Sequence, residues 1–206
     1  MKFVLGRTLT ILSWDNPVTA YFRKSRKLRN SLGAPSRSDF VQFEVYKEKV
    51  RKEMLEFQRA TIDDIDEFMR AKIEAFSDDV RQYGFGPTGY DDYEKEKANI
   101  QNYPTYKILF DGKIIGGITC CNAGDYYWLG GIYIMPSYQN LGIGAKAITF
   151  IENEFPDATR WRLHTPYKNY RNHHFYEKMG YRKIGETEPK MDKGGFYLFE
   201  YEKQKL

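Results

Sequence analysis

The chain has 206 residues, 41% of them hydrophobic, and a net charge of +4 at neutral pH. This length accommodates one domain and an appendage, and the hydrophobic content excludes a chain that is disordered throughout. No apolar run approaches the roughly 20 residues that cross a bilayer as a helix, so we predict no membrane partner.

The two cysteines, Cys120 and Cys121, are adjacent in the sequence. Adjacent cysteines do not readily bridge each other, so a disulfide framework is excluded. Only three histidines are present and no cysteine pair has ligand spacing, so we predict no metal site. Free thiols are typical of the reducing cytosol, which favours a cytoplasmic location.

Positive charge is concentrated at the beginning of the chain. Residues 1–53 carry a net charge of +7, whereas residues 54–206 carry −3. Such a basic segment can contact nucleic acid or an acidic partner, but it is more often a solvated surface segment. We therefore interpret 1–53 as a basic N-terminal extension of unknown role, with nucleic acid as its less favoured partner, and 54–206 as the functional domain.

Strands and helices are expected to alternate from residue 55 onward. Leu55–Ala60 is a strand candidate, and Thr61 follows as the expected N-cap of an amphipathic helix. The apolar stripe of that helix consists of Ile65, Phe68, Met69, Ile73 and Phe76. Residues 83–92 are expected to form a Gly-rich aromatic loop, and Tyr93–Tyr103 the next helix.

Strands dominate the middle of the chain. Tyr106–Phe110 and Lys113–Cys121 flank Asp111-Gly112, which is a strong hairpin signal, and Tyr126–Ile134 is expected to be a third strand. The remaining predicted elements are helices over Gly144–Phe155 and Tyr170–Met179, and strands over Arg160–Thr165, Tyr181–Ile184 and Gly195–Glu202. The resulting order, β-α-α-β-β-β-α-β-α-β-β, predicts an α/β fold with a mixed sheet and helices on both faces.

A short segment between a predicted strand and a predicted helix carries the first chemical signal. It reads Gln139-Asn140-Leu141-Gly142-Ile143-Gly144. Glycine permits positive φ and lets backbone N–H groups approach an anion closely. The N–H groups and the positive dipole end of the following helix attract the same kind of ligand. We therefore predict a pyrophosphate pocket here.

Two other phosphate-binding motifs were compared with this loop. A nucleotide P-loop requires GxxxxGK[ST], which the chain lacks. A dinucleotide-binding fingerprint would find a third small residue at Ala147, but it should follow the first strand of a βαβ unit. Because the loop follows several predicted antiparallel strands, the dinucleotide interpretation fails.

Two motifs resemble those of the GNAT family of N-acetyltransferases. Residues 139–144 match its Q/R-x-x-G-x-G/A signature, and Asn169–Tyr181 resembles its closing helix, usually written N…FYEKxGF. The resemblance covers about residues 55–206 and makes 54–206 a GNAT acetyltransferase domain. It implies a mostly antiparallel sheet with splayed central strands, acetyl-CoA as co-substrate and no metal.

The resemblance also implies which residues contact acetyl-CoA. The backbone of Ile132, Tyr133 and Ile134 would pair with the pantetheine arm as a pseudo-strand. The pyrophosphate would be held by the amides of Gln139, Asn140, Leu141, Gly142, Ile143, Gly144 and Ala145. Asn169 or Asn172 would bond the pantetheine amide, and both stay open because their spacing places them near one helix face.

Tyr176 matches the family position that often protonates the departing thiolate, and it is our candidate catalytic residue. The alternative is a packed aromatic beside Phe175. No carboxylate occurs within Tyr126–Ile134, where many family members carry their general base. His164 is the nearest substitute by residue type, although a lone strand histidine is more often structural.

We expect the acceptor beside the loop at 83–93, as in the family. Tyr83, Phe85, Tyr90 and Tyr93, with Asp91 and Asp92, would suit a cationic amine, or the aromatics simply pack together. Asp125 is a further loop carboxylate that could attract such a substrate. The His173-His174 pair is not expected to bind metal, and Cys120 and Cys121 are expected to be buried strand residues.

The predicted function is transfer of acetyl from acetyl-CoA to a primary amine, preferably of a small molecule, by direct attack. One alternative is an acetyl-CoA-binding sensor without turnover, which the missing strand carboxylate supports. Another is acetylation of a protein or a tRNA-bound amine. The oligomeric state is open, with a homodimer among the alternatives.

Overall fold

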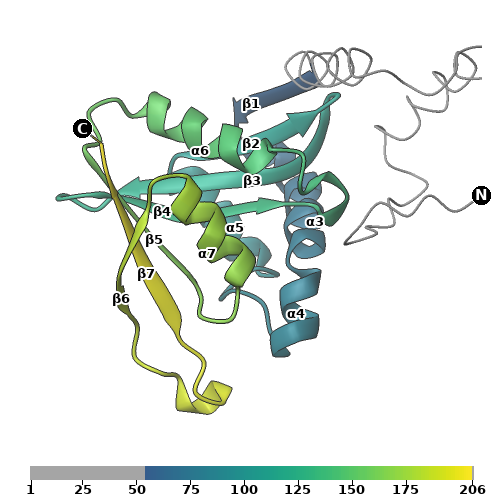
Figure 1. Cartoon of the computed structure of the whole chain (residues 1–206). Helices are drawn as coiled ribbons and strands as arrows, with labels where there is room; N and C mark the ends of the chain where they lie inside the picture. Colours follow the sequence, from purple (N-terminus) through teal and green to yellow (C-terminus); the bar gives the residue numbers. More distant parts are fainter. Residues whose placement is uncertain (1–53, 206) are drawn as a thin grey trace, which may run out of the picture. The chain divides into compact units, whose positions relative to one another are not determined.

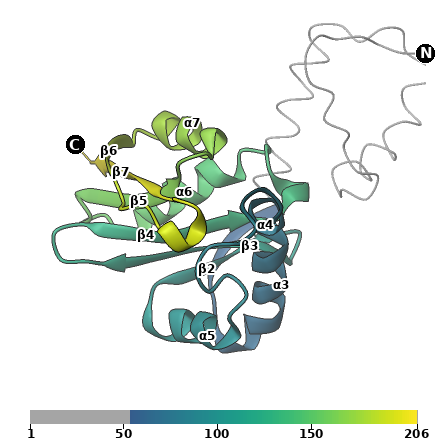
Figure 2. The ribbon, with the colours of Figure 1, turned by 90° about the horizontal axis from the view of Figure 1, so that it is seen from below.

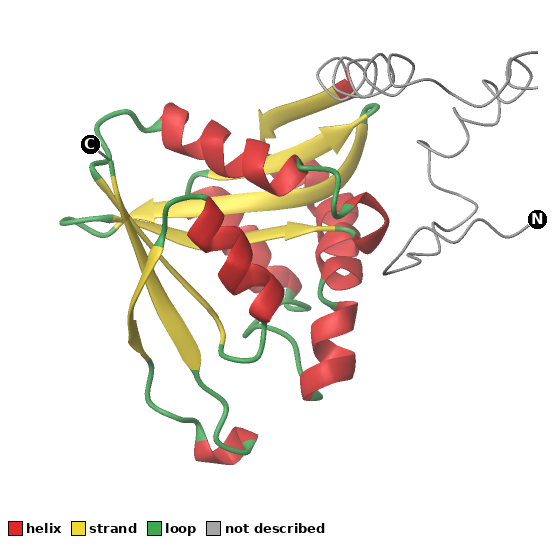
Figure 3. Cartoon of the chain, in the orientation of Figure 1, coloured by secondary structure: helices red, strands yellow, loops and turns green. Residues whose placement is uncertain are grey.

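The computed structural model describes residues 54–205 (Figure 1). The predictions made for residues 1–53, including their interpretation as a basic extension, lie outside the described residues. Within the described range, strands and helices alternate broadly as predicted (Figure 3). No helix in this range is long and apolar enough to cross a bilayer.

One sheet of seven strands organises residues 54–205, in the order β1-β2-β3-β4-β5-β7-β6. The strands are β1 (Leu55–Arg59), β2 (Thr105–Phe110), β3 (Lys113–Asn122), β4 (Tyr127–Ile134), β5 (Arg160–Pro166), β6 (Arg182–Glu186) and β7 (Leu198–Gln204). Every neighbouring pair is antiparallel except β4 and β5, which are parallel. The predicted mixed, mostly antiparallel sheet is confirmed.

The β2–β3 hairpin has the turn that its sequence predicts. Asp111 has φ of 53° and Gly112 has φ of 72°. Positive φ at both central residues is the geometry of a type I′ turn, whose twist matches that of the flanking strands. The hairpin fixes the register in which Phe110 pairs with Lys113.

The helices cover both faces of the sheet, as predicted. They are α3 (Ile65–Ala75), α4 (Ser77–Tyr83), α5 (Tyr93–Asn102), α6 (Ile143–Glu154) and α7 (Tyr170–Lys178). Seen along the sheet, α6 and α7 lie on one side and α3 and α5 on the other (Figure 2). On α3, Phe68 and Met69 are buried, but Ile73 is 44% exposed because the buried face runs through Ala71 instead. Helix α4 is not among the elements predicted from the sequence.

The central strands β4 and β5 separate soon after they meet. Their pairing consists of Tyr127 with Trp161 and Trp128 with Arg162. Beyond Trp128, β4 stays paired with β3 but no longer pairs with β5, and Gly130 and Gly131 have no side chain to cover the strand. The backbone N–H and C=O groups on this edge of β4 are therefore open to a ligand. The predicted splay of the central strands is confirmed.

Strand β7 contacts the neighbouring strands and helix α6. It pairs with β5 on one side and β6 on the other. Lys203 on β7 donates to both carboxylate oxygens of Glu152 on α6, at 2.9 and 2.7 Å, and Tyr181 donates to the same carboxylate at 3.2 Å. Removing one partner of such a buried pair leaves an uncompensated charge, which costs about 3–5 kcal/mol. This cluster therefore anchors α6 to the last strand.

Candidate functional site

Two adjoining cavities lie where β4 and β5 separate. The first, which we call the loop cavity, has a volume of about 310 Å³ and is bordered by α4, the end of β4, residues 138–145 and α7. The second, the aromatic cavity, has about 340 Å³ and lies between the α4–α5 loop, β4, β5 and the β6–β7 connection. The residues that line both are Phe76, Asp79, Ile132, Asn172 and Tyr176.

The loop cavity is framed by the backbone of the predicted pyrophosphate loop. Asn140 has φ of 60° and Gly142, the N-cap of α6, has φ of 77°. These left-handed conformations turn the chain so that the first N–H groups of α6 point out of the helix end. Gln139 donates from Nε2 to the carbonyl of Ile134 at 2.8 Å, which ties the loop to the end of β4. The segment therefore offers several backbone donors to an anion.

Helix α7 forms the opposite border of the loop cavity. Asn169 caps this helix, because its Oδ1 accepts from the backbone N–H of Asn172 at 3.1 Å. Phe175 packs on Gly144, where a Cβ would meet its ring at 3.2 Å. Both Asn169 and Asn172 line the cavity, so the structure leaves the choice between them open.

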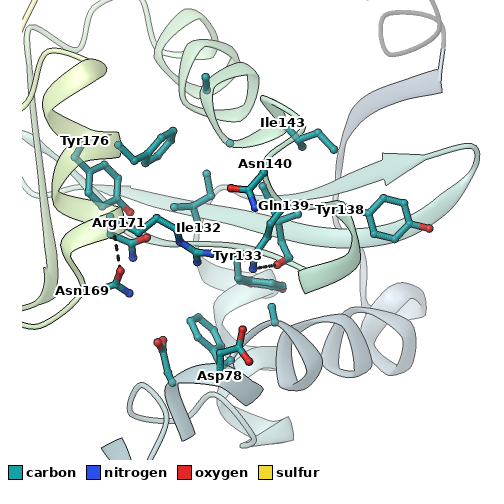
Figure 4. A pocket seen from close by; sticks show the side chains of 18 of the residues that line it. Asp78, Ile132, Tyr133, Tyr138, Gln139, Asn140, Ile143, Asn169, Arg171 and Tyr176 are labelled. Carbon is teal, nitrogen blue, oxygen red and sulfur yellow. Dashed lines mark hydrogen bonds between the residues drawn. The ribbon is translucent and has the colours of Figure 1, made fainter. Parts of the chain in front are cut away.

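Charged residues that the sequence analysis missed also reach the loop cavity. The guanidinium of Arg171 donates to Oε1 of Gln139 at 2.7 Å, and Figure 4 shows its side chain extending from α7 toward the loop. Asp78 and Asp79 on α4 line the facing side. Burial raises the pKa of the Asp79 carboxyl, and the nearby Arg171 partly offsets that shift. No sequence motif predicts α4. The positions of Asp78 and Asp79 at the cavity therefore could not be predicted from the sequence.

Tyr176 lies at the junction of the two cavities. Its side chain is buried, and burial raises the pKa of its hydroxyl well above the usual value near 10. A group with a raised pKa keeps its proton throughout the ordinary pH range. Tyr176 can therefore offer a proton, and not a phenolate, to a group that enters either cavity.

The aromatic cavity receives only part of the predicted acceptor loop. Tyr83 and Phe85 line it and pack with Phe196, at ring-centroid distances of 5.5 and 5.0 Å respectively. Tyr90 instead packs edge-on against Phe76 at 6.3 Å, and Tyr93 is 41% exposed at the beginning of α5. Two of the four aromatics thus line this cavity, and whether they contact an acceptor or only pack together stays open.

Among the candidate acidic and basic residues Asp91, Asp92, Asp125 and His164, only His164 lines the aromatic cavity. Asp92 caps α5 by accepting from the backbone N–H of Lys95 at 3.0 Å. Asp91 and Asp125 are exposed and belong to neither lining. His164 does line the aromatic cavity, but its Nε2 lies 2.9 Å from a carboxylate oxygen of Glu200. The lysines that line this cavity, Lys190 and Lys193, were not foreseen.

The surroundings of the two cysteines and of His173 indicate structural roles. Burial raises the pKa of the Cys120 thiol to about 12, and that of Cys121 also rises by burial. His173 Nε2 lies 2.8 Å from the carbonyl oxygen of Pro166. Between residues 54 and 205, no cluster of three or more histidine, cysteine or acidic side chains has the geometry to hold a metal ion. A thiolate nucleophile at Cys120 does not fit this environment.

Comparison with known proteins decides the family. The model of the acetyltransferase (GNAT) family matches residues 65–181, which contain β4, the pyrophosphate loop, α6 and α7. The chain belongs to the GNAT acetyltransferase family. As a member, it is an acetyl-CoA-dependent acetyltransferase, and the resemblance of its two motifs to that family is confirmed.

Individual proteins and solved structures also resemble the chain. The uncharacterized protein YrkN of Bacillus subtilis is 31% identical over 144 residues, which cover 67% of this chain and 70% of YrkN. The PaiA N-acetyltransferase of Thermoplasma acidophilum, solved in complex with coenzyme A, has a TM-score of 0.62 at 18% identity, over 73% of this chain and 99% of that one. The ribosomal-protein-S18-alanine N-acetyltransferase of Escherichia coli has a TM-score of 0.61 at 15% identity, over 73% and 94%. These structural likenesses show the shared fold.

The predicted acetyl-CoA contacts of this GNAT domain converge in space. Those that line the loop cavity are Ile132, Tyr133, Ile134, Gln139, Asn140, Gly142, Ile143, Gly144, Ala145, Asn169 and Asn172. Leu141 is the predicted member that does not line it. Which of these residues touch acetyl-CoA stays a prediction.

Proposed function

We propose that this acetyltransferase moves the acetyl group of acetyl-CoA to the primary amine of a small molecule by direct attack. The observation that carries the proposal is the junction of the two cavities at Ile132 and Tyr176. A donor along the loop cavity and an acceptor in the aromatic cavity would bring thioester and amine together there. Holding two reactants in such proximity supplies a large part of a catalyst's effect.

The donor half of the proposal rests on backbone groups. The open edge of β4 at Ile132–Ile134 suits the amides of a pantetheine arm, and the N–H groups from Gln139 to Ala145 suit a pyrophosphate. One N–H of β4 would also stabilise the oxyanion that develops when the thioester carbonyl is attacked. The cavity needs no metal for these contacts.

Tyr176 is the proposed proton donor. The amine nitrogen, once free of its ammonium proton, forms a bond to the carbonyl carbon, and the carbon–sulfur bond then breaks. The hydroxyl of Tyr176 gives its proton to the departing sulfur. The second nitrogen proton, lost as the amide forms, returns the tyrosine to its neutral state. The buried hydroxyl is protonated before the transfer.

The size of the aromatic cavity favours a small acceptor. At about 340 Å³, it falls at the lower end of the range of roughly 300–1,000 Å³ that small-molecule sites occupy. A protein or tRNA-bound amine would insert only its end there. The interpretation with nucleic acid depends on residues 1–53, which lie outside the described residues. A cytoplasmic location and a homodimer stay predictions.

A panel of amines tests this function. The full chain is incubated with acetyl-CoA and each amine, and release of the CoA thiol is followed at fixed pH. We expect at least one small primary amine to accelerate thiol release, with the acetylated amine identified by mass spectrometry. If acetyl-CoA binds in calorimetry but no amine accelerates thiol release, the sensor without turnover replaces the enzyme.

A further inference from the structure

The charges around the aromatic cavity are separated between its two ends. Asp79 belongs to the end shared with the loop cavity, where Tyr176 also lies. Lys190 and Lys193 line the aromatic cavity but not the loop cavity, and both belong to the β6–β7 connection, not to an element that borders the junction. An occupant of this cavity would therefore meet a carboxylate at one end and two ammonium groups at the other.

Asp79 is the one carboxylate among residues 54–205 that lines both cavities. Helix α4 holds it half-buried, on the side of the junction that faces β4 and α7. Strand β4 contains no carboxylate of its own. A partly buried carboxylate at this place suits an ammonium group, because desolvation strengthens the attraction between them.

The two lysines are held at the tip of the β6–β7 hairpin. Lys190 pairs with Phe196 through its backbone, donating at 2.8 Å, and its carbonyl accepts from Gly195 at 3.0 Å. A single 3-10 turn, Met191–Lys193, has Lys190 as its N-cap and Lys193 as its last residue. The ammonium of Lys193 lies 4.5 Å from the ring centre of Phe85, which closes the tip against the α4–α5 loop. The hairpin thus places both lysines in the lining of the aromatic cavity.

Apolar and unpartnered polar groups lie between the two ends. Phe85, Phe196 and Leu198 supply apolar surface. Thr165 is 2% exposed, and its hydroxyl has no hydrogen-bond partner among the described residues; the same holds for the hydroxyl of Tyr83. Buried polar atoms of this kind are costly unless a ligand or water satisfies them. The lining is therefore suited to an acceptor with an apolar body and a polar group.

We infer that the acceptor is an amine with an anionic group at its other end, a carboxylate or a phosphate, bound between Asp79 and the lysine pair 190/193. This inference rests on the proposed acetyl transfer and names its substrate class. Asp79 attracts the ammonium group and takes one of its protons, which frees the nitrogen lone pair for attack on the thioester. The lysine pair binds the anion and repels polycationic amines.

Matched acceptors test the inference in the unmodified chain. We use a dipeptide with a free carboxylate, the same dipeptide with a C-terminal amide, a phosphorylated amino alcohol with its unphosphorylated parent, and a polyamine. Each anionic member should exceed its neutral counterpart in kcat/KM by about tenfold, the effect of one charge-assisted contact. The better of the two anionic members identifies whether carboxylate or phosphate is preferred. Equal or higher kcat/KM for the neutral compounds or the polyamine would overturn the inference.

Two sets of variants assign the effect to residues. Lys190→Gln with Lys193→Gln should abolish the preference for the anionic acceptor by raising its KM. The control, Lys168→Gln with Lys178→Gln, removes two exposed positive charges outside the cavity and should keep the preference. Asp79→Asn should lower kcat for every amine, whereas Asp91→Asn on the exposed loop should not.

The outcomes separate this inference from the proposed function. If neutral or polycationic amines are acetylated best, the acetyl transfer stands and the substrate class is wrong. If the preference for anionic amines survives in the variant lacking Lys190 and Lys193, the lysine pair does not bind the anion and the inference fails. If no amine of any charge accelerates thiol release, both fail together. The comparison of acceptors in the unmodified chain holds even where a variant does not fold.

Discussion

The loop cavity and the aromatic cavity adjoin, yet they are built in different ways. The loop cavity includes one continuous segment, 138–145, whose backbone conformation and helix end offer N–H donors. The aromatic cavity gathers side chains from the α4–α5 loop, β5 and the tip of the β6–β7 hairpin. A site made of backbone tolerates much variation in side chains, whereas a site made of side chains changes with each substitution. Substitutions can therefore test the binding of acetyl-CoA and the binding of the acceptor amine separately.

Substitution at the junction should lower turnover most strongly, because the loop cavity and the aromatic cavity meet there. Tyr176→Phe removes the proposed proton donor and keeps the ring. We expect turnover to fall by at least about tenfold, since general acid catalysis contributes that much or more. Acetyl-CoA affinity, measured by calorimetry, should stay near that of the unmodified chain.

A matched tyrosine gives the control for this prediction. Tyr181 is also buried but lies outside both linings and donates to Glu152. Tyr181→Phe should lower stability without a comparable loss of turnover at equal folded fraction. Turnover that is unchanged in Tyr176→Phe would remove the proton-donor role.

Gly142→Ala should affect the loop cavity alone. Gly142 has φ of 77°, which an alanine adopts at a cost of about 1–2 kcal/mol, so the loop would change its conformation. We expect acetyl-CoA affinity to fall by about tenfold, which corresponds to ~1.4 kcal/mol. Gly124→Ala is the matched control, because Gly124 has φ of 90° in the β3–β4 turn and lies outside both cavities. Equal affinity losses in the two variants would contradict the prediction.

Arg171→Ala should have a smaller effect on acetyl-CoA binding in the loop cavity. Arg171 is exposed and bonds Gln139, so we expect acetyl-CoA affinity to fall by about two- to fivefold, the size of a solvent-screened ion contact. The difference should shrink as salt is raised, because salt screens exposed charges. Lys178→Ala, at the other end of α7, provides the control. An effect on the KM of the amine alone would assign Arg171 to the aromatic cavity instead.

The smallest effects are expected at the cysteines. Because burial raises the pKa of Cys120 to about 12, only about one thiol in ten thousand is a thiolate at pH 8. Iodoacetamide should therefore leave Cys120 unmodified in the folded chain and alkylate it in denaturant, as peptide mass spectrometry can show. Modification of the folded chain should increase as pH rises toward 12. Cys121→Ser should leave turnover within about twofold of the unmodified chain.

The donor half could be predicted from the sequence because its signals are local. Asp111-Gly112 specifies a hairpin turn, and Gly142 and Gly144 lie within three residues of each other at the beginning of α6. Gly180, with φ of 89°, follows the predicted end of α7. Each of these signals acts through the backbone conformation of a few residues. The order of elements around them then indicates the family fold.

The acceptor half could not be predicted because its residues come together only in the folded chain. Helix α4 has seven residues, too few for a periodic pattern to reveal it, so Asp79 looked like any acidic surface residue. Lys190 and Lys193 lie far along the chain from Phe85, which lines the same cavity and contacts Lys193. Asp92, whose loop position and charge indicate a substrate contact, instead caps α5.

The position of β7 between β5 and β6 has a consequence for the order in which the molecule can form. During synthesis, β1 to β4 can pair with one another as they emerge, because each neighbours the next. Strand β5 shares only two register pairs with β4, and its other neighbour is made after β6. Long-range pairing of this kind is slow, and unpaired strand edges invite association with other chains. The half of the sheet that carries His164 can therefore complete its pairing only after β7 has been made, and the connection with Lys190 and Lys193 takes its place beside the cavity at the same stage.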